Sequence, residues 1–595
     1  MAKIIVFSPY SLIWIQAFPE AIVAESLKKS GHDVVYITCA GSLNAGCVCL
    51  SMQGIHSDSF NDRRAQVCHQ CSSRADLIRR EMGFTGYALA SVEDPEDEGR
   101  VKEVMASLSP ANFSEFMIDG IAIGRIAAFE FLLDRKKINV DFSESEWQQY
   151  RPILKSAIKA FYILKRIFDK EKPDYVLSYN GVYSVNAVCS HLAMGRGIAP
   201  YFMHAGGNLS ARLSTLMLGR KQMYYYMAGL IKRWPVIKER PCAKSLLFAV
   251  TAHFLELLRG RSAFVYSSPK SKNHVDVRRF FGIRPEQKIL VATMSSYDEI
   301  FAAEFVGIFL RSASLLFATQ ADWVKALLAW VRARPDYFLI IRVHPREFPN
   351  KRESVMSEHA RILQALFVNL PKNVMVNWPD DKLSLYDLAC EADVVLNSWS
   401  SAGKEMALLG IPVVAYNQEM MFYPVDIHYF GESEELYFDQ VQRALQDGWS
   451  FERMRMAYRW HVMEFGRSII RIDESYTGTA TYKNKVQLKF VNGLRRLYPL
   501  IQEWNDCRKR SVRLKCAEVL NQVFIKGAEM PFDVMERGDE VAPSLEQETG
   551  YLKIEMARIA KAMWGGIDNA ETGQNNKLYQ HFKKSLLDES RTISF

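Results

Sequence analysis

The chain has 595 residues, of which 49% are hydrophobic and 24% charged, and its net charge is +8 at pH 7. This balance is typical of a globular protein with room for several domains, and the small excess of charge neither indicates nor excludes a nucleic acid or membrane partner. No run reaches the roughly 18 to 20 apolar residues that a membrane helix needs. The amino terminus has no small-residue cleavage site, and ten cysteines in so long a chain do not suggest a disulfide scaffold. We therefore predict a protein of the reducing cytoplasm.

Residues 3–40 predict a β-α-β unit. A short apolar strand is followed by an amphipathic helix that ends before Gly31, and then by a second apolar strand. No Gly-x-Gly-x-x-Gly follows the first strand, so nothing here lets the backbone approach a pyrophosphate. This absence argues against a dinucleotide oxidoreductase.

Cysteines are concentrated between residues 39 and 71, where five of the ten occur. Cys68 and Cys71 have the Cys-x-x-Cys spacing that chelates a metal from one turn, which predicts a structural zinc. The alternative is that Cys39 is a core strand residue and that the others are incidental. A thioredoxin-like redox role is not favoured, because that motif opens a helix directly after a strand. The expected zinc ligands are Cys47, Cys49, Cys68 and Cys71, with Cys39 or a histidine as alternates.

Two further segments carry candidate catalytic residues. Asp119 and Gly120 precede a helix with small residues along one face, so Asp119 is either a candidate base or ordinary turn chemistry. Residues 148–207 return to the α/β pattern and place Asn180 and His204 at the carboxyl ends of two predicted strands. His204 could take a proton from a substrate hydroxyl, because imidazole titrates near neutrality, or it could be hydrogen-bonded within a turn.

Residues 208–275 mix basic and aromatic side chains beside an apolar helix. Such a surface suits an anionic membrane, where lipid-linked acceptors reside. RNA binding is the second interpretation, although no RNA-binding motif accompanies these residues, and a solvated helical face is the third. The basic residues are Arg220, Lys221, Lys232, Arg233, Lys238, Arg240 and Lys244.

Residues 337–417 contain three short runs rich in Val and Ile that alternate with helical patterns. Buried parallel strands joined by crossover helices have this pattern, and ligands bind outside the carboxyl ends of such strands. Polar residues follow two of the runs, and the second polar loop leads into a helix. Backbone N–H groups at the start of that helix, together with Lys404, could bind a phosphate. Glu405 could accept hydrogen bonds from ribose hydroxyls. Ordinary helix capping is the alternative. The predicted nucleotide site comprises His344, Arg346, Ser398, Ser400, Ser401, Lys404 and Glu405.

In this region HP is followed by D-L-x-x-x-A-D-V-V-x-x-S-x-S-S-x-G-x-E-x-x-x-x-G-x-P-V-V. This pattern resembles the carboxyl-terminal half of bacterial surface-polysaccharide glycosyltransferases of the two-lobed GT-B type, especially the capsule enzymes that transfer 3-deoxy-manno-octulosonic acid (Kdo). Similar HP and SS motifs hold the CMP part of the donor in bacterial sialyltransferases. The resemblance implies that His344 contacts the nucleotide phosphate or ribose, Ser400 and Ser401 the phosphate, and Glu405 the ribose. Arg346 after the HP and Trp399 among the serines depart from the pattern, which leaves the nucleotide base open.

Together these features predict an α/β protein of the GT-B kind, with two Rossmann-like doubly wound lobes facing a cleft and a helical extension. The expected bounds are 1–275 for an acceptor-side lobe that includes the cysteine-rich insertion and the basic helical region. We expect the nucleotide lobe at 276–485 and the extension at 486–595.

The expected function is transfer of a sugar from a nucleotide-activated donor to a surface polysaccharide or glycolipid, at the inner face of the cytoplasmic membrane. The resemblance implies CMP-Kdo or a related CMP-sugar, with inversion of the anomeric centre. We expect no catalytic metal and no nucleic acid partner. The candidate bases are Asp119, His204 and Glu20, and Asn180 is expected to bind the acceptor. Alternatives are a CDP-polyol phosphate transferase, a nucleotide-sugar epimerase and a non-catalytic assembly module.

Overall fold

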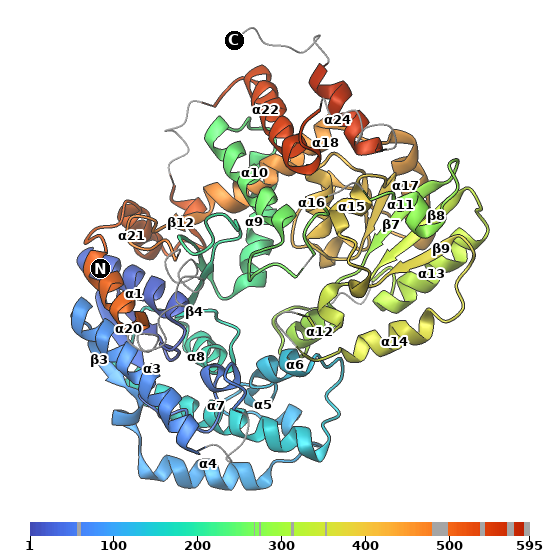
Figure 1. Cartoon of the computed structure of the whole chain (residues 1–595). Coiled ribbons are helices and arrows are strands. Elements are labelled where there is room, and N and C mark those ends of the chain that lie inside the picture. Colours follow the sequence, from blue (N-terminus) through green and yellow to red (C-terminus); the bar gives the residue numbers. More distant parts are fainter. Residues whose placement is uncertain are drawn as a thin grey trace.

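The computed structural model describes residues 1–595 except 56–60, 267, 273–274, 311–314, 351–353, 479–497, 536–541, 568–575 and 588–595. The strands form two sheets, one in each of two lobes (Figure 1). The predicted α/β class with two Rossmann-like lobes is confirmed.

The first sheet has the strand order β12-β6-β5-β4-β1-β2-β3. Strands β1 to β5 are parallel, whereas β6 pairs antiparallel with β5 and β12 antiparallel with β6. Most strand interiors are apolar and buried, as expected for a sheet with helices on both faces. The strands are β1 (Lys3–Phe7), β2 (Asp33–Thr38), β3 (Thr85–Ala88), β4 (Tyr175–Tyr179), β5 (Ala199–Ala205), β6 (Thr215–Arg220) and β12 (Ile469–Arg471).

The second sheet is parallel throughout and has the order β11-β10-β7-β8-β9. The first five strands of each lobe are therefore arranged as in a doubly wound Rossmann fold, in which ligands bind where the strand order reverses. These reversal points lie between β1 and β4 in the first lobe and between β7 and β10 in the second. The strands of the second sheet are β7 (Lys288–Thr293), β8 (Tyr337–Arg342), β9 (Val374–Asn377), β10 (Val394–Asn397) and β11 (Val413–Ala415).

Helices provide the crossovers between the parallel strands. In the first lobe they are α1 (Trp14–Lys29), α2 (Val48–Ser51), α3 (Asn61–Met82), α4 (Pro95–Ser107), α5 (Ile123–Ile126), α6 (Phe129–Arg135), α7 (Glu144–Glu171) and α8 (Ser184–Gly195). Between the strands of the two sheets the chain forms α9 (Met223–Ile237), α10 (Lys244–Arg259) and α11 (Val277–Phe281). The second lobe contains α12 (Tyr297–Phe305), α13 (Gln320–Arg332), α14 (Glu358–Leu366), α15 (Leu385–Ala389), α16 (Ala402–Leu408), α17 (Glu434–Asp447) and α18 (Phe451–Val462), and α18 continues into a π-helix at Met463–Arg467. The last helices are α20 (Tyr498–Lys509), α21 (Ala517–Lys526), α22 (Leu545–Trp564) and α24 (Lys577–Leu587).

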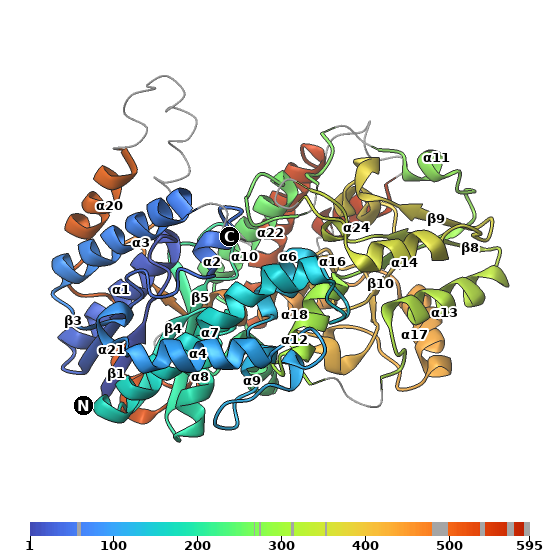
Figure 2. The ribbon, with the colours of Figure 1, turned by 90° about the horizontal axis from the view of Figure 1, so that it is seen from below.

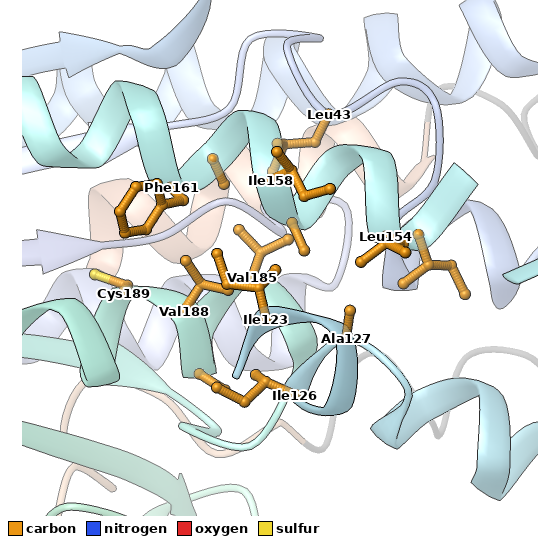
Figure 3. Packing of buried hydrophobic residues seen from close by; sticks show 14 of the residues in the cluster. Leu43, Ile123, Ile126, Ala127, Leu154, Ile158, Phe161, Val185, Val188 and Cys189 are labelled. Atoms are coloured by element: carbon orange, nitrogen blue, oxygen red, sulfur yellow. The ribbon is translucent and has the colours of Figure 1, made fainter. Parts of the chain in front are cut away.

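The core of the first lobe is built largely on α7, the longest helix described. A capping box starts α7, because the Ser143 side chain accepts from the Glu146 N–H and the Glu146 carboxylate accepts from the Ser143 N–H. Its apolar face packs against α5 and α8, as Figure 3 shows for Ile158, Ile123 and Val188. All three of these side chains are fully buried.

The chain after the second lobe returns to both lobes (Figure 1). Strand β12 joins the edge of the first sheet, and α20 and α21 pack beside α3 and α1. Helices α22 and α24 pack instead on the second lobe, where Glu548 of α22 is fully buried between Arg455 and Arg459 of α18. The described helices of the segment expected at 486–595 therefore form two separate layers, and the packing units are not contiguous in sequence.

The two lobes touch through α6 and the loop after β8. Helix α6 lies against α12 of the second lobe, and this contact is visible in Figure 2. The fully buried Lys136 follows α6 and donates from Nζ to the carbonyl oxygens of Arg346 and Val355, the latter at 2.6 Å. Lys137 pairs with Glu358 at 2.9 Å. A charged amine that donates to buried carbonyls fixes the position of this loop.

Candidate functional site

Polar side chains from three strands meet at the carboxyl edge of the second sheet. Ser295 and Ser296 follow β7, His344 follows β8, and Ser398 follows β10. The Ser398 hydroxyl donates to the Ser295 hydroxyl at 2.9 Å, and the Ser296 hydroxyl lies 3.4 Å from His344 Nδ1. Burial lowers the pKa of His344, so its imidazole is neutral at pH 7. Residues from distant parts of the chain thus form one polar cluster at the reversal point of this sheet, in which the three serines are buried.

The loop after β10 brings a carboxylate and an ammonium group to the same edge. Glu405 is held by hydrogen bonds from the Ser401 hydroxyl and the Tyr386 hydroxyl, both at 2.8 Å. Lys404 pairs with Glu464 at 2.6 Å. A Cβ at Gly403 would lie 2.1 Å from the Tyr423 hydroxyl, so only glycine allows this close packing.

The side chains of Ser400 and Arg346 have partners within the protein. Ser400 Oγ accepts from the Ala402 N–H at 3.2 Å. Arg346 is buried, pairs with Asp298 at 2.8 Å and donates to the Leu133 carbonyl of the first lobe at 3.0 Å. Burial raises the pKa of Asp298 to about 7, although the nearby Arg346 guanidinium opposes the rise. The Arg346 guanidinium therefore links the two lobes behind His344.

A small pocket marks the reversal point of the first sheet, between β1 and β4. Tyr10, Gln16 and Glu20 are among the residues that line it. Glu20 is 2% exposed, and its Oε1 accepts from the Tyr179 N–H at 2.8 Å. Burial raises the pKa of Glu20 to about 8, and hydrogen bonds from Ser8 and Tyr179 oppose this rise. Glu20 therefore titrates close to neutral pH, the range in which a carboxyl group can transfer protons.

His204 lies beside this pocket at the end of β5. Its ring is 5.8 Å from the Tyr179 ring, and its Nδ1 is 3.1 Å from the Ala205 carbonyl oxygen. Burial and the positive charge of Arg212 lower the pKa of His204 to about 4, which makes it a weak base at pH 7. Two of the three predicted bases, Glu20 and His204, thus flank Tyr179.

The third predicted base and the predicted acceptor residue have different surroundings. Asp119 lies on a turn with φ +49°, where its half-exposed carboxylate pairs with Lys165 of α7 at 2.6 Å. Asn180 directly follows β4 and has φ +57°, and its Oδ1 accepts from the Val182 N–H at 3.3 Å. Asn180 lies next to the pocket residue Tyr179, whereas the ion pair places Asp119 on the surface of α7.

The strand ends of the two lobes approach each other at Glu464, a residue that the sequence analysis did not single out. Glu464 lies in the π-helix, and π-helical turns often occur at functional sites. Its carboxylate pairs with Lys404, and a Cβ built at Gly207, in the loop after β5, would lie 3.2 Å from Glu464 Oε1. No local signal marks Glu464, because its partner Lys404 lies far away in sequence.

The predicted zinc ligands are only partly brought together. The Cys49 thiol contacts the thiols of Cys47 and Cys71, and these contacts lower the pKa of Cys47 and Cys71 and raise that of Cys49. Burial raises the pKa of Cys68 to about 11. Within the part of the chain that the structure describes, no three His, Cys, Asp or Glu side chains are arranged to hold a metal ion. The zinc stays a prediction, which elemental analysis of protein prepared without chelators would test.

Several basic residues of the 208–275 region are paired within the protein. Arg220 donates to the Gly527 carbonyl, Arg233 pairs with Asp533 at 2.6 Å, and Lys238 pairs with Asp426 at 3.1 Å. Lys232 and Lys244 are exposed. Among the described residues, no helix has the length and apolar character needed to cross a bilayer.

No protein-family model matches the chain, and neither does any curated protein sequence. Among solved structures, the chain is similar to the β-Kdo 2,4-transferase of Thermosulfurimonas dismutans KpsC, at 16% identity and a TM-score of 0.31 over 49% of this chain and 80% of that one. It is also similar to the β-Kdo 2,7-transferase of the same KpsC, at 14% identity and a TM-score of 0.29 over 58% and 97%. A putative UDP-N-acetylglucosamine 2-epimerase from Listeria monocytogenes matches at 10% identity and a TM-score of 0.25 over 78% and 94%. At such TM-scores no functional argument rests on these likenesses.

Proposed function

We propose that the protein is a glycosyltransferase that takes a sugar from a nucleotide-activated donor. The observation that carries the proposal is the polar cluster formed by Ser295, Ser398, Ser296 and His344 at the reversal point of the second sheet. In doubly wound sheets this is the place where nucleotides bind. The HP and SS motifs that resemble those of Kdo transferases and sialyltransferases lie on this same edge, which supports a CMP-sugar as the donor.

The acceptor is proposed to bind at the first lobe, against the pocket that contains Glu20. A hydroxyl of a surface polysaccharide or glycolipid would lose its proton to the ionised form of Glu20, whose population rises as the pH approaches its pKa of about 8. Ionised Glu20 is a stronger base than His204, whose pKa is about 4. Asn180 beside the pocket would position the acceptor. Asp119 remains a predicted base, and the turnover of the Asp119→Asn variant tests this role directly.

Departure of the nucleotide leaves negative charge on its phosphate, which a preorganised cation stabilises. Lys404 is the proposed cation, and nearby Ser400 and Ser401 would donate hydrogen bonds to the phosphate. Glu464 holds Lys404 at 2.6 Å and so orients it before the substrate arrives. Arg346 would act indirectly, by fixing the loop that carries His344. Direct displacement at the anomeric carbon would invert its configuration, and this scheme assigns no step to a catalytic metal.

Nucleotide binding provides the first test. Calorimetric titration with CMP, CDP and UDP should give binding, and His344→Ala or Glu405→Ala should weaken it by roughly 1.5 to 3 kcal/mol, the value of a charge-assisted hydrogen bond. His191→Ala is the matched control, because His191 lies on α8, away from the second sheet. Unchanged affinity of both site variants for every nucleotide would contradict the proposed location.

Turnover with CMP-Kdo and a crude glycolipid fraction provides the second test. We expect transfer with inversion, which persists in EDTA and falls on Glu20→Gln while donor binding remains. Loss of activity in EDTA that magnesium or manganese restores would contradict the metal-free scheme, and retention of configuration would contradict direct displacement. An isomerised donor sugar without transfer would identify an epimerase, and transfer of a polyol phosphate would identify a CDP-polyol transferase.

A further inference from the structure

A cavity of about 190 Å³ lies at the amino edge of the second sheet, where its parallel strands begin. Lys288 opens β7, and Asp393 and Pro412 directly precede β10 and β11, so three adjacent strands contribute to its walls. The polar cluster that contains Ser398 lies at the opposite edge. The whole of β10 separates Asp393 from Ser398, a length of roughly 17 Å. The cavity is therefore distinct from the proposed nucleotide site.

Helix α24 closes one side of this cavity. Lys577 and His581 both line it, and residues four positions apart lie on the same face of a helix. The Leu578 N–H donates to the Cys390 carbonyl oxygen at 3.1 Å, which holds the start of α24 against the second lobe. The strand ends of the sheet and a helix from much later in the chain thus enclose one space.

Two lysines share one carboxylate at the cavity. Asp393 pairs with Lys577 at 2.6 Å and with Lys288 at 3.5 Å, and its Oδ2 also accepts from the Ile289 N–H at 2.7 Å. Two ammonium groups and one carboxylate leave a net charge of +1 at this place. The Lys288 side chain has the longer ion pair and is 55% exposed, so its ammonium group can turn toward a ligand at little cost. The charge of the cavity therefore favours an anion.

The other walls are aromatic and apolar. The Trp449 and His581 rings stack with their centroids 5.4 Å apart, and the indole N–H donates to the Leu409 carbonyl oxygen at 2.7 Å, which fixes the orientation of the indole. Ile411 and Leu445 also line the cavity. Its volume of about 190 Å³ far exceeds the roughly 10 to 15 Å³ that one water molecule requires. An organic group therefore fits beside the anion.

We propose that this cavity binds a phosphate monoester of a small polar organic group, such as a sugar. The phosphate lies between Lys288 and Lys577, because each ammonium group supplies three donors and a phosphate monoester carries almost two negative charges at pH 7. The organic group packs against Trp449, and its hydroxyl groups donate to Asp393. The ligand contacts both the sheet and α24, so it stabilises the packing of that helix on the second lobe. This site is independent of the proposed glycosyl transfer.

Calorimetric titration of the full-length protein tests the binding. The probes are glycerol 3-phosphate, glucose 1-phosphate and glucose 6-phosphate, with inorganic phosphate and glucose for comparison. We expect saturable binding of at least one ester, weaker binding of inorganic phosphate and no binding of glucose. Lys288→Ala should weaken ester binding by about tenfold or more, the loss expected for one hydrogen bond to a charged group. Lys325→Ala is the matched control, because Lys325 is an exposed lysine of α13 outside the cavity.

Two further measurements locate the ligand. Ala392→Leu fills the cavity without changing its charge and should abolish ester binding. Amide hydrogen exchange in α24 should slow when the ester is bound, and excess CMP should not displace the ester.

The inference is overturned if no ester binds at millimolar concentration, or if inorganic phosphate or glucose binds as tightly as the esters. It is also overturned if Lys288→Ala or Ala392→Leu binds the ester like the parent protein, if CMP displaces the ester, or if exchange in α24 is unchanged while the ester is bound. CMP binding in the absence of ester reports on the proposed nucleotide site alone, so failure of that proposal and failure of this one are distinguishable.

Discussion

Replacement of Glu20 by glutamine tests the electrostatic account of the pocket in the first lobe. Burial raises the pKa of Glu20 from 4.5 to about 8 against hydrogen bonds from Ser8 and Tyr179. At neutral pH the folded protein therefore keeps a proton on this carboxyl group that the unfolded chain has released. Glutamine can still accept from the Tyr179 N–H and cannot ionise, so Glu20→Gln removes the titration and keeps the contact.

The sign and size of the effect follow from proton linkage. The free energy of unfolding falls with rising pH wherever the folded state binds more protons than the unfolded state. Between pH 4.5 and about 8 this holds for Glu20, and each pH unit costs about 1.4 kcal/mol. Over the whole window the cost to stability is about 5 kcal/mol. Below pH 4.5 both states are protonated and above pH 8 both are ionised, so the dependence vanishes at either end.

The assay is the thermal midpoint of the parent and of Glu20→Gln in buffers from pH 5 to pH 9. The two midpoints should be similar at pH 5, and the variant should become progressively more stable than the parent up to pH 8. Glu25→Gln is the matched control on the same helix, because ion pairs with Arg510 and Lys29 lower the pKa of Glu25 against the effect of burial. Its stabilisation is present above pH 4.5 and lost as pH falls, so that variant should be less stable at pH 7. Parallel pH curves for the parent and Glu20→Gln would refute the reasoning.

Three further substitutions test the packing around the sites. Lys136→Met should lower the free energy of unfolding by about 2 to 5 kcal/mol, because buried carbonyl groups lose their charged donor. A chemical denaturation curve equal to that of the parent protein would contradict this prediction. Glu548→Gln should cost about 3 to 5 kcal/mol in the same measurement, because two buried arginines lose their counter-charge. Gly403→Ala should cost about 1 to 3 kcal/mol through its clash with the Tyr423 hydroxyl, whereas Gly195→Ala, with open space around it, should be neutral or stabilising.

The sequence predicts those parts of the fold that depend on the pattern of apolar and polar residues within a single short segment. His344 and Ser398 follow Val- and Ile-rich runs, and a buried parallel strand that ends in a polar residue needs no distant information to be recognised. Their common position at one sheet edge then follows from the parallel arrangement of the strands. The same reasoning placed Asn180 and His204 at strand ends of the first lobe.

The features that sequence reasoning missed depend on distant partners. Glu464 could not be singled out without its partner Lys404. Glu20 is a predicted base, but its raised pKa follows only from its burial, which the sequence does not reveal. Asp119 is predicted in the same way, but it pairs with Lys165 on the exposed side of α7. A charge gives no local sign of whether it will be buried against another lobe or exposed to water.

Strand β12 has a consequence for how the protein is made. The first sheet reaches its last strand only when Ile469–Arg471 pairs with β6, which ends at Arg220. At roughly 5 to 20 residues per second, a ribosome needs on the order of 10 to 50 s to make the chain between them. During that time β6 presents an unpaired edge to the cell, and such edges recruit other strands. Newly made chains should therefore depend on chaperones more than a protein whose lobes close in sequence order.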